Sequence, residues 1–341
     1  MHMTISVDLM GGDHAPEAVI SGVSLALGKT DPSVRFLLFG TKEALDAASS
    51  ALSGPEASRI GYVETAEVID CEEAPTTAIR KKKDSSLVKA VESVAAGNAD
   101  CVVSAGNTGA LLAAATLIIK RIKGVKRPAL VTALPTVQGK YAVLLDSGAN
   151  TDCKPEYLNQ FGIMGAEYAK ANLDIADPRV ALLNNGAEKA KGNELTKQAY
   201  LLLEASESVR FCGNCEARDV LSGDYDVIVA DGFDGNVLLK GIEGTAMALF
   251  KMLKDELYSS LRSKIGALLA KPAFRALKHK MDYSEVGGAV LLGVNGGVVK
   301  AHGSSNAKAF MNAILQAEKL INSGMIGTIT DYFASQQPEN E

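Results

Sequence analysis

Short apolar runs alternate with segments of helical period along most of the chain. Nine runs have the length and residue types of buried strands, and seven segments repeat their apolar residues at the spacing of one helix face. The predicted strands are Ile5–Leu9, Val34–Phe39, Arg59–Glu64, Asp100–Ser104, Ala129–Ala133, Ala142–Asp146, Val180–Leu183, Val209–Cys212 and Val227–Asp231. The predicted helices are Ala18–Leu27, Lys42–Ala51, Ser86–Ala96, Thr108–Ile122, Pro155–Ala171, Glu194–Glu204 and Val237–Leu257. Such alternation predicts a three-layer α/β/α fold, in which helices flank a mostly parallel sheet.

Five joints between a strand and the following helix share one composition, with Gly beside Asn, Asp or Ser. They read VDLMGGDHAP, VVSAGNTGALL, VLLDSGANTDCKPE, ALLNNGAEKAKGNE and VIVADGFDGNVLLK. Glycine allows the backbone to approach a ligand, and a helix N-terminus offers N–H donors to an anion. Because the carboxyl ends of parallel strands meet at one edge, we expect these joints to form one anion cradle there. Taken singly, each joint is more typical of an ordinary turn and helix cap, and only the repetition in all five favours the cradle.

Several side chains near these joints could take part in chemistry. His14 and His302 are two of only four histidines and lie in Gly-rich turns, where a histidine can transfer a proton or hold the turn. Lys154 and Lys240 follow two of the joints and could meet an anion. The chain contains neither a P-loop, a G-x-G-x-x-G fingerprint nor a G-x-S-x-G elbow. It also lacks metal-ligand spacing, so we expect no catalytic metal.

Composition and charge narrow the class of protein. The 341 residues carry a net charge of −5, which argues against a general nucleic-acid binder. No stretch of 18 apolar residues and no N-terminal leader pattern is visible, so we expect a cytoplasmic location. Five widely spaced cysteines favour free thiols, although Cys212 and Cys215 leave a redox pair open. Residues 1–330 are expected to form one domain and residues 331–341 a flexible tail.

Two basic segments stand apart from this acidic background. Residues 251–282 contain eight Lys or Arg and three acids, with apolar residues at helical spacing, which predicts a basic amphipathic helical hairpin. Such a hairpin could contact an anionic membrane surface or pack at a dimer interface. The apolar residues concerned are Leu261, Ile265, Leu268, Leu269, Phe274 and Leu277. The run Arg80–Lys83 could dock an acidic partner or form a solvated turn.

The motifs together resemble one known family. The joints quoted above, with RIKGVKRPAL, GNCEARD and VKAHGSSNAKAF, are similar to the bacterial phosphate acyltransferases of phospholipid synthesis, from about residue 4 to about residue 322. The resemblance implies a homodimer whose fold is similar to isocitrate and isopropylmalate dehydrogenases and to phosphotransacetylases. It implies transfer of a long acyl chain from acyl carrier protein to inorganic phosphate, without a cofactor. The product, an acyl-phosphate, would pass to a membrane glycerol-phosphate acyltransferase.

The resemblance also suggests roles for individual residues. Phosphate would be held by the backbone at Gly11, Gly12, Gly106 and Thr108, with Lys154 or Lys240. The thioester carbonyl would accept hydrogen bonds from Asn107, Asn150 or Asn236. A lysine would be oriented, or a phosphate proton accepted, by Asp8, Asp13 or Asp231. The departing sulfur would take a proton from His14 or His302. The acidic carrier protein would dock on Arg80, Lys81, Lys82, Lys83, Arg121, Lys123 and Arg127.

Three alternatives remain at this point. A phosphotransacetylase-type enzyme, which moves a short acyl group between coenzyme A and phosphate, would share the anion cradle but not need the basic hairpin. A dehydrogenase of the isocitrate class should show a set of metal-binding aspartates, which we do not find. A membrane-associated scaffold would tolerate loss of His14, Lys154 or Asn236, whereas an enzyme would not.

Overall fold

The computed structural model describes residues 3–281 and 287–336, and its strands and helices alternate as the sequence predicts. The strands are β1 Thr4–Asp8, β2 Arg35–Gly40, β3 Ile60–Glu64, β4 Cys101–Ser104, β5 Ala129–Pro135, β6 Tyr141–Leu145, β7 Arg179–Asn184, β8 Arg210–Glu216, β9 Val227–Val229, β10 Ala289–Leu292 and β11 Gly297–Lys300. The helices are α1 Glu17–Leu27, α2 Lys42–Ala51, α3 Pro75–Lys81, α4 Ser86–Ala95, α5 Thr108–Ala114, α6 Pro155–Leu173, α7 Glu194–Glu204, α8 Gly232–Leu257, α9 Leu261–Met281, α10 Ala307–Asn322 and α11 Met325–Ser335.

All nine predicted strands and seven predicted helices are present, with shifted ends. Helix α5 ends at Ala114 rather than Ile122, because residues Ala115–Ile119 continue it as a π-helix. Helix α8 begins at Gly232 rather than Val237, because Asp231 caps it by accepting a hydrogen bond from the backbone N–H of Asp234. Five elements were not predicted: α3, β10, β11, α10 and α11. Strands β10 and β11 have four residues each and lie in the Gly-rich stretch GGAVLLGVNGGVVK, whose composition is also typical of turns. Helix α10, by contrast, buries one regular face, so its signal was present in the sequence.

The C-terminal tail begins later than predicted. Helix α11 continues to Ser335, and Phe333, within the predicted tail 331–341, is buried in the core. The boundary at residue 331 is therefore wrong for residues 331–335, and residues 337–341 lie outside the described residues. The predicted hairpin 251–282 also changes: its first arm is the end of the long helix α8, and its last residue, Asp282, lies outside the described residues.

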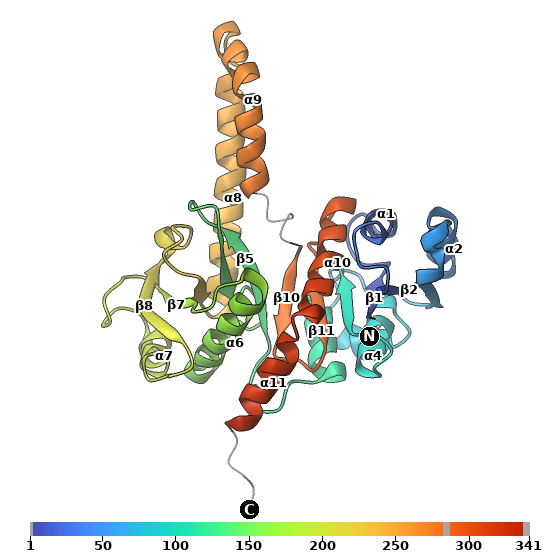
Figure 1. Ribbon diagram of the computed structural model, residues 1–341, viewed down its shortest axis with the longest axis horizontal. Helices are drawn as coiled ribbons and strands as arrows, with labels where there is room; N and C mark the ends of the chain where they lie inside the picture. Colours follow the sequence, from blue (N-terminus) through green and yellow to red (C-terminus); the bar gives the residue numbers. More distant parts are fainter. Residues whose placement is uncertain (1–2, 282–286, 337–341) are drawn as a thin grey trace, which may run out of the picture.

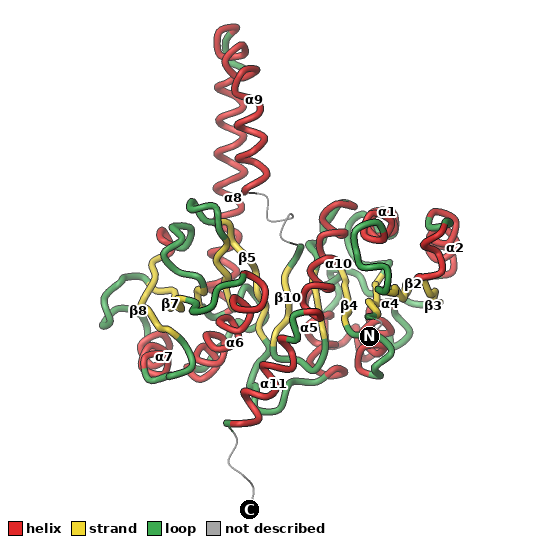
Figure 2. Tube along the Cα trace, in the orientation of Figure 1, coloured by secondary structure: helices red, strands yellow, loops and turns green. Residues whose placement is uncertain are grey.

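The eleven strands of the described residues form one sheet, in the order β3-β2-β1-β4-β11-β10-β5-β6-β9-β7-β8. Most neighbours are parallel, which confirms the predicted α/β class, and Figure 2 shows the strands as a band between helices. However, β10 is antiparallel to β11 and β5, and β6 is antiparallel to β5. Strands β6, β7, β8 and β9 therefore run opposite to β1, β2, β3, β4 and β11. The expectation that all five joints share one edge is wrong, because the direction of the sheet reverses at its centre.

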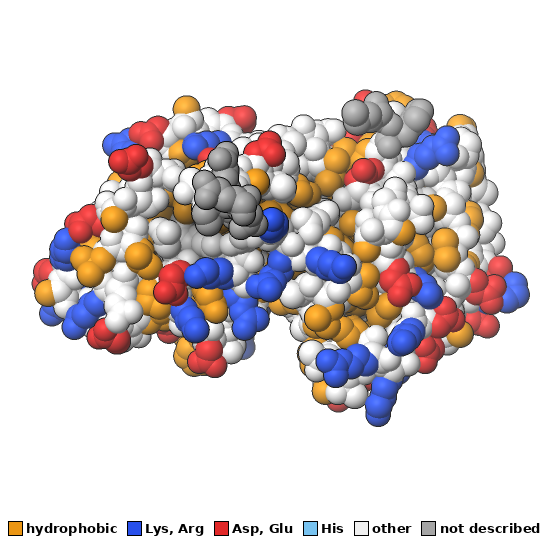
Figure 3. Space-filling model, turned by 90° about the horizontal axis from the view of Figure 1, so that it is seen from below, with side chains coloured by type: hydrophobic (Ala, Val, Ile, Leu, Met, Phe, Trp, Pro, Cys, Tyr) orange, Lys and Arg blue, Asp and Glu red, His pale blue; other side chains and the backbone are white. Residues whose placement is uncertain are grey.

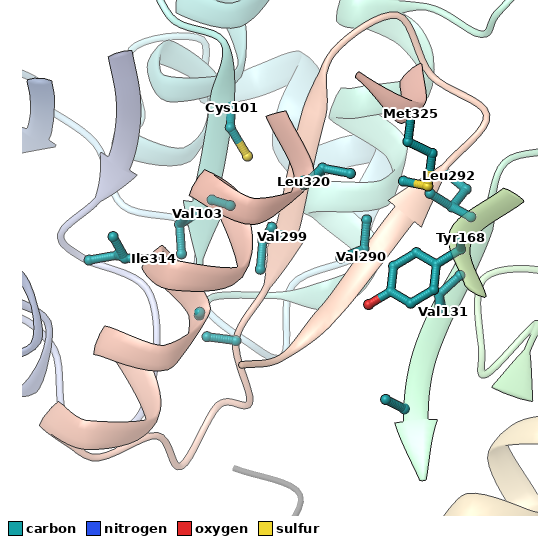
Figure 4. Packing of buried hydrophobic residues seen from close by; sticks show 14 of the residues in the cluster. Cys101, Val103, Val131, Tyr168, Val290, Leu292, Val299, Ile314, Leu320 and Met325 are labelled. Carbon is teal, nitrogen blue, oxygen red and sulfur yellow. The ribbon is translucent and has the colours of Figure 1, made fainter. Parts of the chain in front are cut away.

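The two faces of the sheet are covered differently. On one face a single apolar cluster joins residues of α1, α2, α6, α7, α10 and α11, and Figure 4 shows α10 packed over the central strands through Ile314 and Leu320. On the other face there are two separate clusters, one beneath α4 and α5 and one beside the start of α8. Between these two clusters, over β5 and β10, the sheet face is left open to a cavity.

The long helices α8 and α9 form a hairpin that projects from the rest of the molecule. They lie side by side and extend well beyond the sheet and its covering helices (Figure 1). Only Gly232 and Gly235, in the first turn of α8, are buried in that helix. The hairpin thus contributes its base to the body of the molecule and presents the remaining length to its surroundings.

Candidate active site

A cavity of about 820 Å³ lies on the open part of the second sheet face. Its floor includes Leu130 and Thr132 of β5 and Ala289 and Leu291 of β10. Helix α5 forms one wall and the first turns of α8 form another. A large cavity with an apolar floor and a few polar groups at its edge is the usual form of a small-molecule site. This cavity is therefore the candidate active site.

The joints of both sheet halves reach this cavity although they leave opposite edges. Strand β5 is the meeting point, because Val131 pairs with Val290 on one side and with Leu145 on the other. The joint after β6 turns back over the face, so that Ser147 Oγ lies 2.8 Å from Thr132 Oγ1. Three further segments complete the lining: the start of α5 with Thr108, the start of α8 with Asn236, and the end of β11 with residues 300–303.

The first joint, VDLMGGDHAP, does not line the cavity. A Cβ on Gly11 would stand 2.5 Å from the backbone nitrogen of Gly106, and one on Gly12 would stand 3.0 Å from the carbonyl oxygen of Gly303. Gly12 also has a positive φ of 109°. The joints after β1, β4 and β11 pack backbone against backbone here. Only glycine permits such a close approach, which explains the two glycines. This placement removes Gly11, Gly12 and Gly106 from the lining of the cavity.

Asp13 and His14 are exposed and also lie outside the cavity lining. The Asp13 N–H donates to the carbonyl oxygen of Gly303 at 2.8 Å. The His14 carbonyl oxygen accepts from the N–H of Ala18 at 2.9 Å, at the start of α1. The backbone of both residues therefore ties the first joint to its neighbours.

Asn107 is fully engaged in holding the chain before α3. Its side-chain oxygen accepts from the Ala110 N–H at 2.9 Å and so caps α5. Its amide nitrogen donates to the carbonyl oxygens of Asp70, Cys71 and Glu73, at 3.1, 3.0 and 3.0 Å. Because an amide nitrogen has only two hydrogens, none is left for a substrate carbonyl. The residue that follows, Thr108, does line the cavity.

Asn150 and Asn236 both line the cavity, but only one has an uncommitted amide. Asn150 donates to the Pro128 carbonyl oxygen at 2.7 Å and to Asp146 Oδ2 at 2.8 Å. Asn236 lies against Gly148 and has no hydrogen-bond partner among the described residues. Of the three predicted amides, Asn236 is therefore the one that can donate to a ligand.

Asp146 organises the joint after β6, although the sequence analysis did not single it out. It is fully buried, and its carboxylate accepts from the N–H groups of Leu130, Gly148, Ala149 and Asn150 at 2.8–3.1 Å. Burial raises the pKa of this carboxyl, whereas these hydrogen bonds oppose the rise. Asp146 thus fixes the loop that carries Ser147 into the cavity.

The predicted cations divide between the cavity and the surface. Lys240 lines the cavity and its Nζ lies 2.8 Å from Oε2 of Glu243, another lining residue. Lys154 is exposed before α6 and lies outside the lining. Arg127, predicted as a docking residue, is instead part of the lining. Asp231 caps α8 and is not part of the lining.

His302 lies at the cavity edge, where the sequence led us to expect a proton donor. The Ser304 N–H donates to His302 Nδ1 at 3.3 Å, and the Ser304 hydroxyl lies 2.8 Å from the same nitrogen. A neutral ring that accepts at Nδ1 carries its proton on Nε2. Partial burial lowers the pKa of His302, and the positive charge of Lys240 lowers it further. The ring is thus held mainly neutral, with Nε2 as its protonated nitrogen.

Lys300, the last residue of β11, is the main functional candidate that the sequence analysis missed. Only 7% of it is exposed, yet it lines the cavity. Its Nζ donates to the carbonyl oxygens of Ala105, at 3.1 Å, and of Ala301. Burial lowers its pKa to about 8, and Cys71, Asp8 and Asp13 oppose the change. A lysine at the end of an apolar strand, in VVKAHGSS, was the available signal.

Asp8 lies beneath the cavity rather than in it. It is buried, and its carboxylate accepts from Ser86 Oγ at 2.6 Å, Ser104 Oγ at 2.7 Å and the Met10 N–H at 3.2 Å. Burial raises the pKa of this carboxyl, while the hydrogen bonds and Lys300 act in the opposite direction. Asp8 can therefore influence the cavity only through its neighbours.

The predicted docking cations are not equally available. Lys82 is half-buried, and its Nζ contacts Glu73 Oε1 at 2.5 Å and the Val68 carbonyl oxygen at 2.6 Å. Arg80, Lys81 and Lys83 are exposed around it. Arg121, which donates to the Lys126 carbonyl oxygen, and Lys123 are exposed as well. Figure 3, which shows the face opposite the hairpin, has basic side chains gathered beside a hollow.

The predicted apolar contact residues are mostly exposed on the hairpin. Leu261, Ile265, Leu268, Leu269 and Leu277 are 47–79% exposed, and Phe274 is half-buried. On α8 the exposed large apolar side chains include Met247, Leu249 and Met252. No helix within residues 3–281 and 287–336 is long and apolar enough to cross a membrane. Within the same residues, no group of His, Cys, Asp or Glu side chains could hold a metal ion.

Comparison with solved structures defines the class of fold. A phosphotransacetylase from Streptococcus pyogenes superposes with a TM-score of 0.64 at 17% identity, and 94% of each chain is covered. A branched-chain phosphotransacylase from Enterococcus faecalis gives a TM-score of 0.58, also at 17% identity, over 94% of this chain and 99% of its own. The predicted likeness to the phosphotransacetylase fold is therefore confirmed.

Comparison of sequences defines the family. The model of the fatty acid synthesis protein family matches residues 3–328. The phosphate acyltransferase of Leuconostoc mesenteroides is 48% identical over 99% of this chain and 98% of its own length. That of Geobacillus thermodenitrificans is 49% identical over 96% of this chain and 98% of its own. The chain belongs to the fatty acid synthesis protein family, together with these phosphate acyltransferases, and it is an acyltransferase.

Proposed function

We propose that the protein transfers a long-chain acyl group from the thioester of acyl carrier protein to inorganic phosphate. The observation that carries the proposal is the composition of the cavity, which combines an apolar floor and wall with cations and one uncommitted amide. The cations are Arg127, Lys240 and Lys300, and the amide belongs to Asn236. The names of the relatives agree with this combination of an anion and an acyl group.

The size of the cavity favours a substrate larger than phosphate. A volume of about 820 Å³ equals that of roughly 27 water molecules, at about 30 Å³ each. Inorganic phosphate alone would leave most of this space unfilled. Leu112, Ala113 and Leu117 of α5 and Leu239 of α8 provide apolar lining beyond the polar groups. We infer that the acyl chain lies along this wall of α5.

The chemistry needs no covalent enzyme intermediate. A phosphate oxygen attacks the thioester carbonyl carbon and forms the new C–O bond, the C–S bond breaks, and the phosphate proton ends on the sulfur. A thiol with a pKa of about 8.5 is a good leaving group, so orientation and charge stabilisation supply most of the rate. Asn236 would donate to the developing oxyanion, and the His302 Nε2–H would donate a hydrogen bond to the departing sulfur, which takes its proton from the phosphate.

The partners follow from the surface around the cavity. Pro75 and Thr76, at the start of α3, line the cavity. The exposed cations lie at the end of α3 or just after it, and they are Arg80, Lys81 and Lys83. An acidic carrier protein bound there, and at Arg121 and Lys123, would have its thioester within reach of the opening. The charge distribution would mainly increase the rate of encounter.

The projecting hairpin would bind the membrane surface and hold the cavity, which the first turns of α8 line, close to it. Its exposed leucines and its basic residues suit an anionic lipid surface, where an amphiphilic acyl-phosphate could be passed on. We propose a peripheral position at the inner face of the membrane, near a glycerol-phosphate acyltransferase. The same apolar surface could also pack in a homodimer, from which the tip of the hairpin protrudes.

Product formation with purified protein tests the proposal. Radiolabelled inorganic phosphate is incubated with long-chain acyl carrier protein in one tube and with acetyl-coenzyme A in another. The proposal expects label in a lipid-soluble, hydroxylamine-sensitive product only in the first tube, and its loss in Asn236→Ala. Label with acetyl-coenzyme A alone would favour a phosphotransacetylase, and no label in either tube would favour a scaffold.

A further inference from the structure

Three polar side chains form a row across the sheet beneath the cavity. Val7 of β1 pairs with Val103 of β4, so the residues that follow them, Asp8 and Ser104, are neighbours. Ser104 pairs directly with Lys300 of β11. In sheets, residues directly opposite one another in register project from the same face. Asp8, Ser104 and Lys300 therefore lie side by side on the face that carries the cavity.

Within this row, Ser104 separates the two charges. Its hydroxyl donates to Asp8 Oδ2 at 2.7 Å and accepts from the Gly106 N–H at 3.0 Å. Lys300 forms no ion pair within the described residues, although Asp8 is close enough to act on it electrostatically. A buried cation without a contacting counter-ion is costly, and such groups are concentrated at functional sites.

The hydrogen bonds of Lys300 leave one donor for a ligand. An ammonium group has three N–H donors, and the carbonyl oxygens of Ala105 and Ala301 take two of them. No third acceptor is present among the described residues, and the side chain forms part of the cavity lining. The remaining donor and the uncompensated charge are therefore available to an anion in the cavity.

We propose that Lys300 forms an anion subsite at the base of the cavity, that this subsite holds the phosphate, and that Asp8 is a positioning residue for Lys300. The inference rests on the proposed function and deepens it. A buried charge that lacks a counter-ion before the reaction favours a fully charged ligand over a carbonyl oxygen that becomes negative only during it. Phosphate bound here would lie beside the floor residue Ala289, which pairs with Lys300 across β10 and β11.

Direct phosphate binding to the full-length protein tests the subsite without the acyl donor. Equilibrium dialysis with radiolabelled inorganic phosphate compares the wild type with Lys300→Met, Lys300→Arg and the control Lys29→Met, an exposed residue after α1. We expect Lys300→Met to weaken phosphate binding by at least about tenfold, since it removes a charge-assisted hydrogen bond. Lys300→Arg should retain part of the affinity, and Lys29→Met all of it.

The pH dependence separates a positioning role of Asp8 from a structural one. The groups that face Lys300 are Asp8 on β1, Asp13 on the following joint, Cys71 before α3 and His302. Phosphate binding should be lost as the pH rises and Lys300 loses its proton. Asp8→Asn removes a negative charge that favours protonated Lys300, so the midpoint of this loss should lie at lower pH than in the wild type. A merely structural Asp8 would change stability without moving this midpoint.

The outcomes distinguish the subsite from the proposed reaction. Unchanged phosphate affinity in folded Lys300→Met, or no phosphate binding to the wild type, would overturn the subsite. Phosphate binding that depends on Lys300, without any acyl-phosphate formed from acyl carrier protein, would support the subsite and reject the proposed function. Thermal unfolding of each variant shows whether lost binding reflects lost folding.

Discussion

Gly11 and Gly106, which belong to different joints, meet backbone to backbone. A Cβ added to Gly11 would lie 2.5 Å from the Gly106 nitrogen, 2.9 Å from its Cα and 2.6 Å from Asp8 Oδ2. Real Cβ atoms do not approach other atoms so closely, so the joints after β1 and β4 could not pack together with any other residue at position 11. This contact keeps Asp8 and Ser104 together beneath the cavity.

Gly11→Ala should therefore destabilise the protein. Overpacking of a tight contact costs about 1–3 kcal/mol, and here part of the strain would fall on the Asp8–Ser104 pair. Urea unfolding measures the loss of free energy. The control is Gly327→Ala on α11, where nothing lies within 4 Å, and where alanine should stabilise the helix by about 0.5–1 kcal/mol. Equal stability of Gly11→Ala and the wild type would contradict the predicted contact.

The lowered pKa of Lys300 makes the stability of the protein depend on pH. Its pKa of about 8 lies below the ordinary 10.5, so the unfolded chain binds this proton more tightly and folding is opposed below pH 8. The penalty, up to about 3 kcal/mol, is relieved as the pH rises from 8 to 10.5. Relative to Lys300→Met, the wild type should therefore gain stability over this range.

Urea unfolding of both proteins at pH 7 and pH 10 measures this gain. Other titrating groups cancel in the difference, because both proteins contain them. Lys300→Arg stays charged throughout, so it should show no comparable relief. A difference between wild type and Lys300→Met that is the same at both pH values would show that Lys300 is not perturbed.

The apolar wall of α5 should select long acyl chains. Ala113→Phe adds a ring to this wall and should reduce activity with long-chain acyl carrier protein by at least about tenfold, with a smaller effect on short chains. Steady-state rates with donors of different chain length measure the effect. Ala47→Phe, on the exposed face of α2, is the control. An equal loss with all chain lengths would mean that the chain lies elsewhere.

Reversal of charge after α3 should weaken the encounter with the carrier protein. The double variant Arg80→Glu and Lys83→Glu should raise the KM for acyl carrier protein and reduce its salt dependence, while the KM for phosphate stays the same. The matched control is Lys29→Glu with Arg35→Glu, which changes the net charge by the same amount at exposed positions after α1 and at the start of β2. If both variants raise the KM equally, only net charge matters and no docking site exists at α3.

The hairpin should bind anionic lipid through its exposed leucines. Leu268→Asp with Leu269→Asp places two charges among side chains that are 69% and 79% exposed, so co-sedimentation with anionic vesicles should be lost. Light scattering measures the oligomeric state of the same variant. Retained vesicle binding together with dissociation of an oligomer would assign this surface to an interface between copies of the chain.

Most of the local structure could be predicted from the sequence. Nine strands and seven helices follow from apolar periodicity, and the joints carry the glycines and caps that such turns require, as at Asn107 before α5. These features depend on residues close together in the chain, where local propensity and the period of burial decide the outcome. The apolar face of α10 belonged to the same predictable set.

Which side chains meet could be seen only once the whole sheet was assembled. The reversal of direction at β5 and β10 arises from pairings between distant strands, and it determines which joints reach the cavity. Lys300 and Ser104 are paired although almost two hundred residues separate them, and the space that Gly11 leaves is filled by Gly106. Register and strand order depend on the packing of the whole sheet, so no local pattern could place Lys300 under the cavity or His14 outside it.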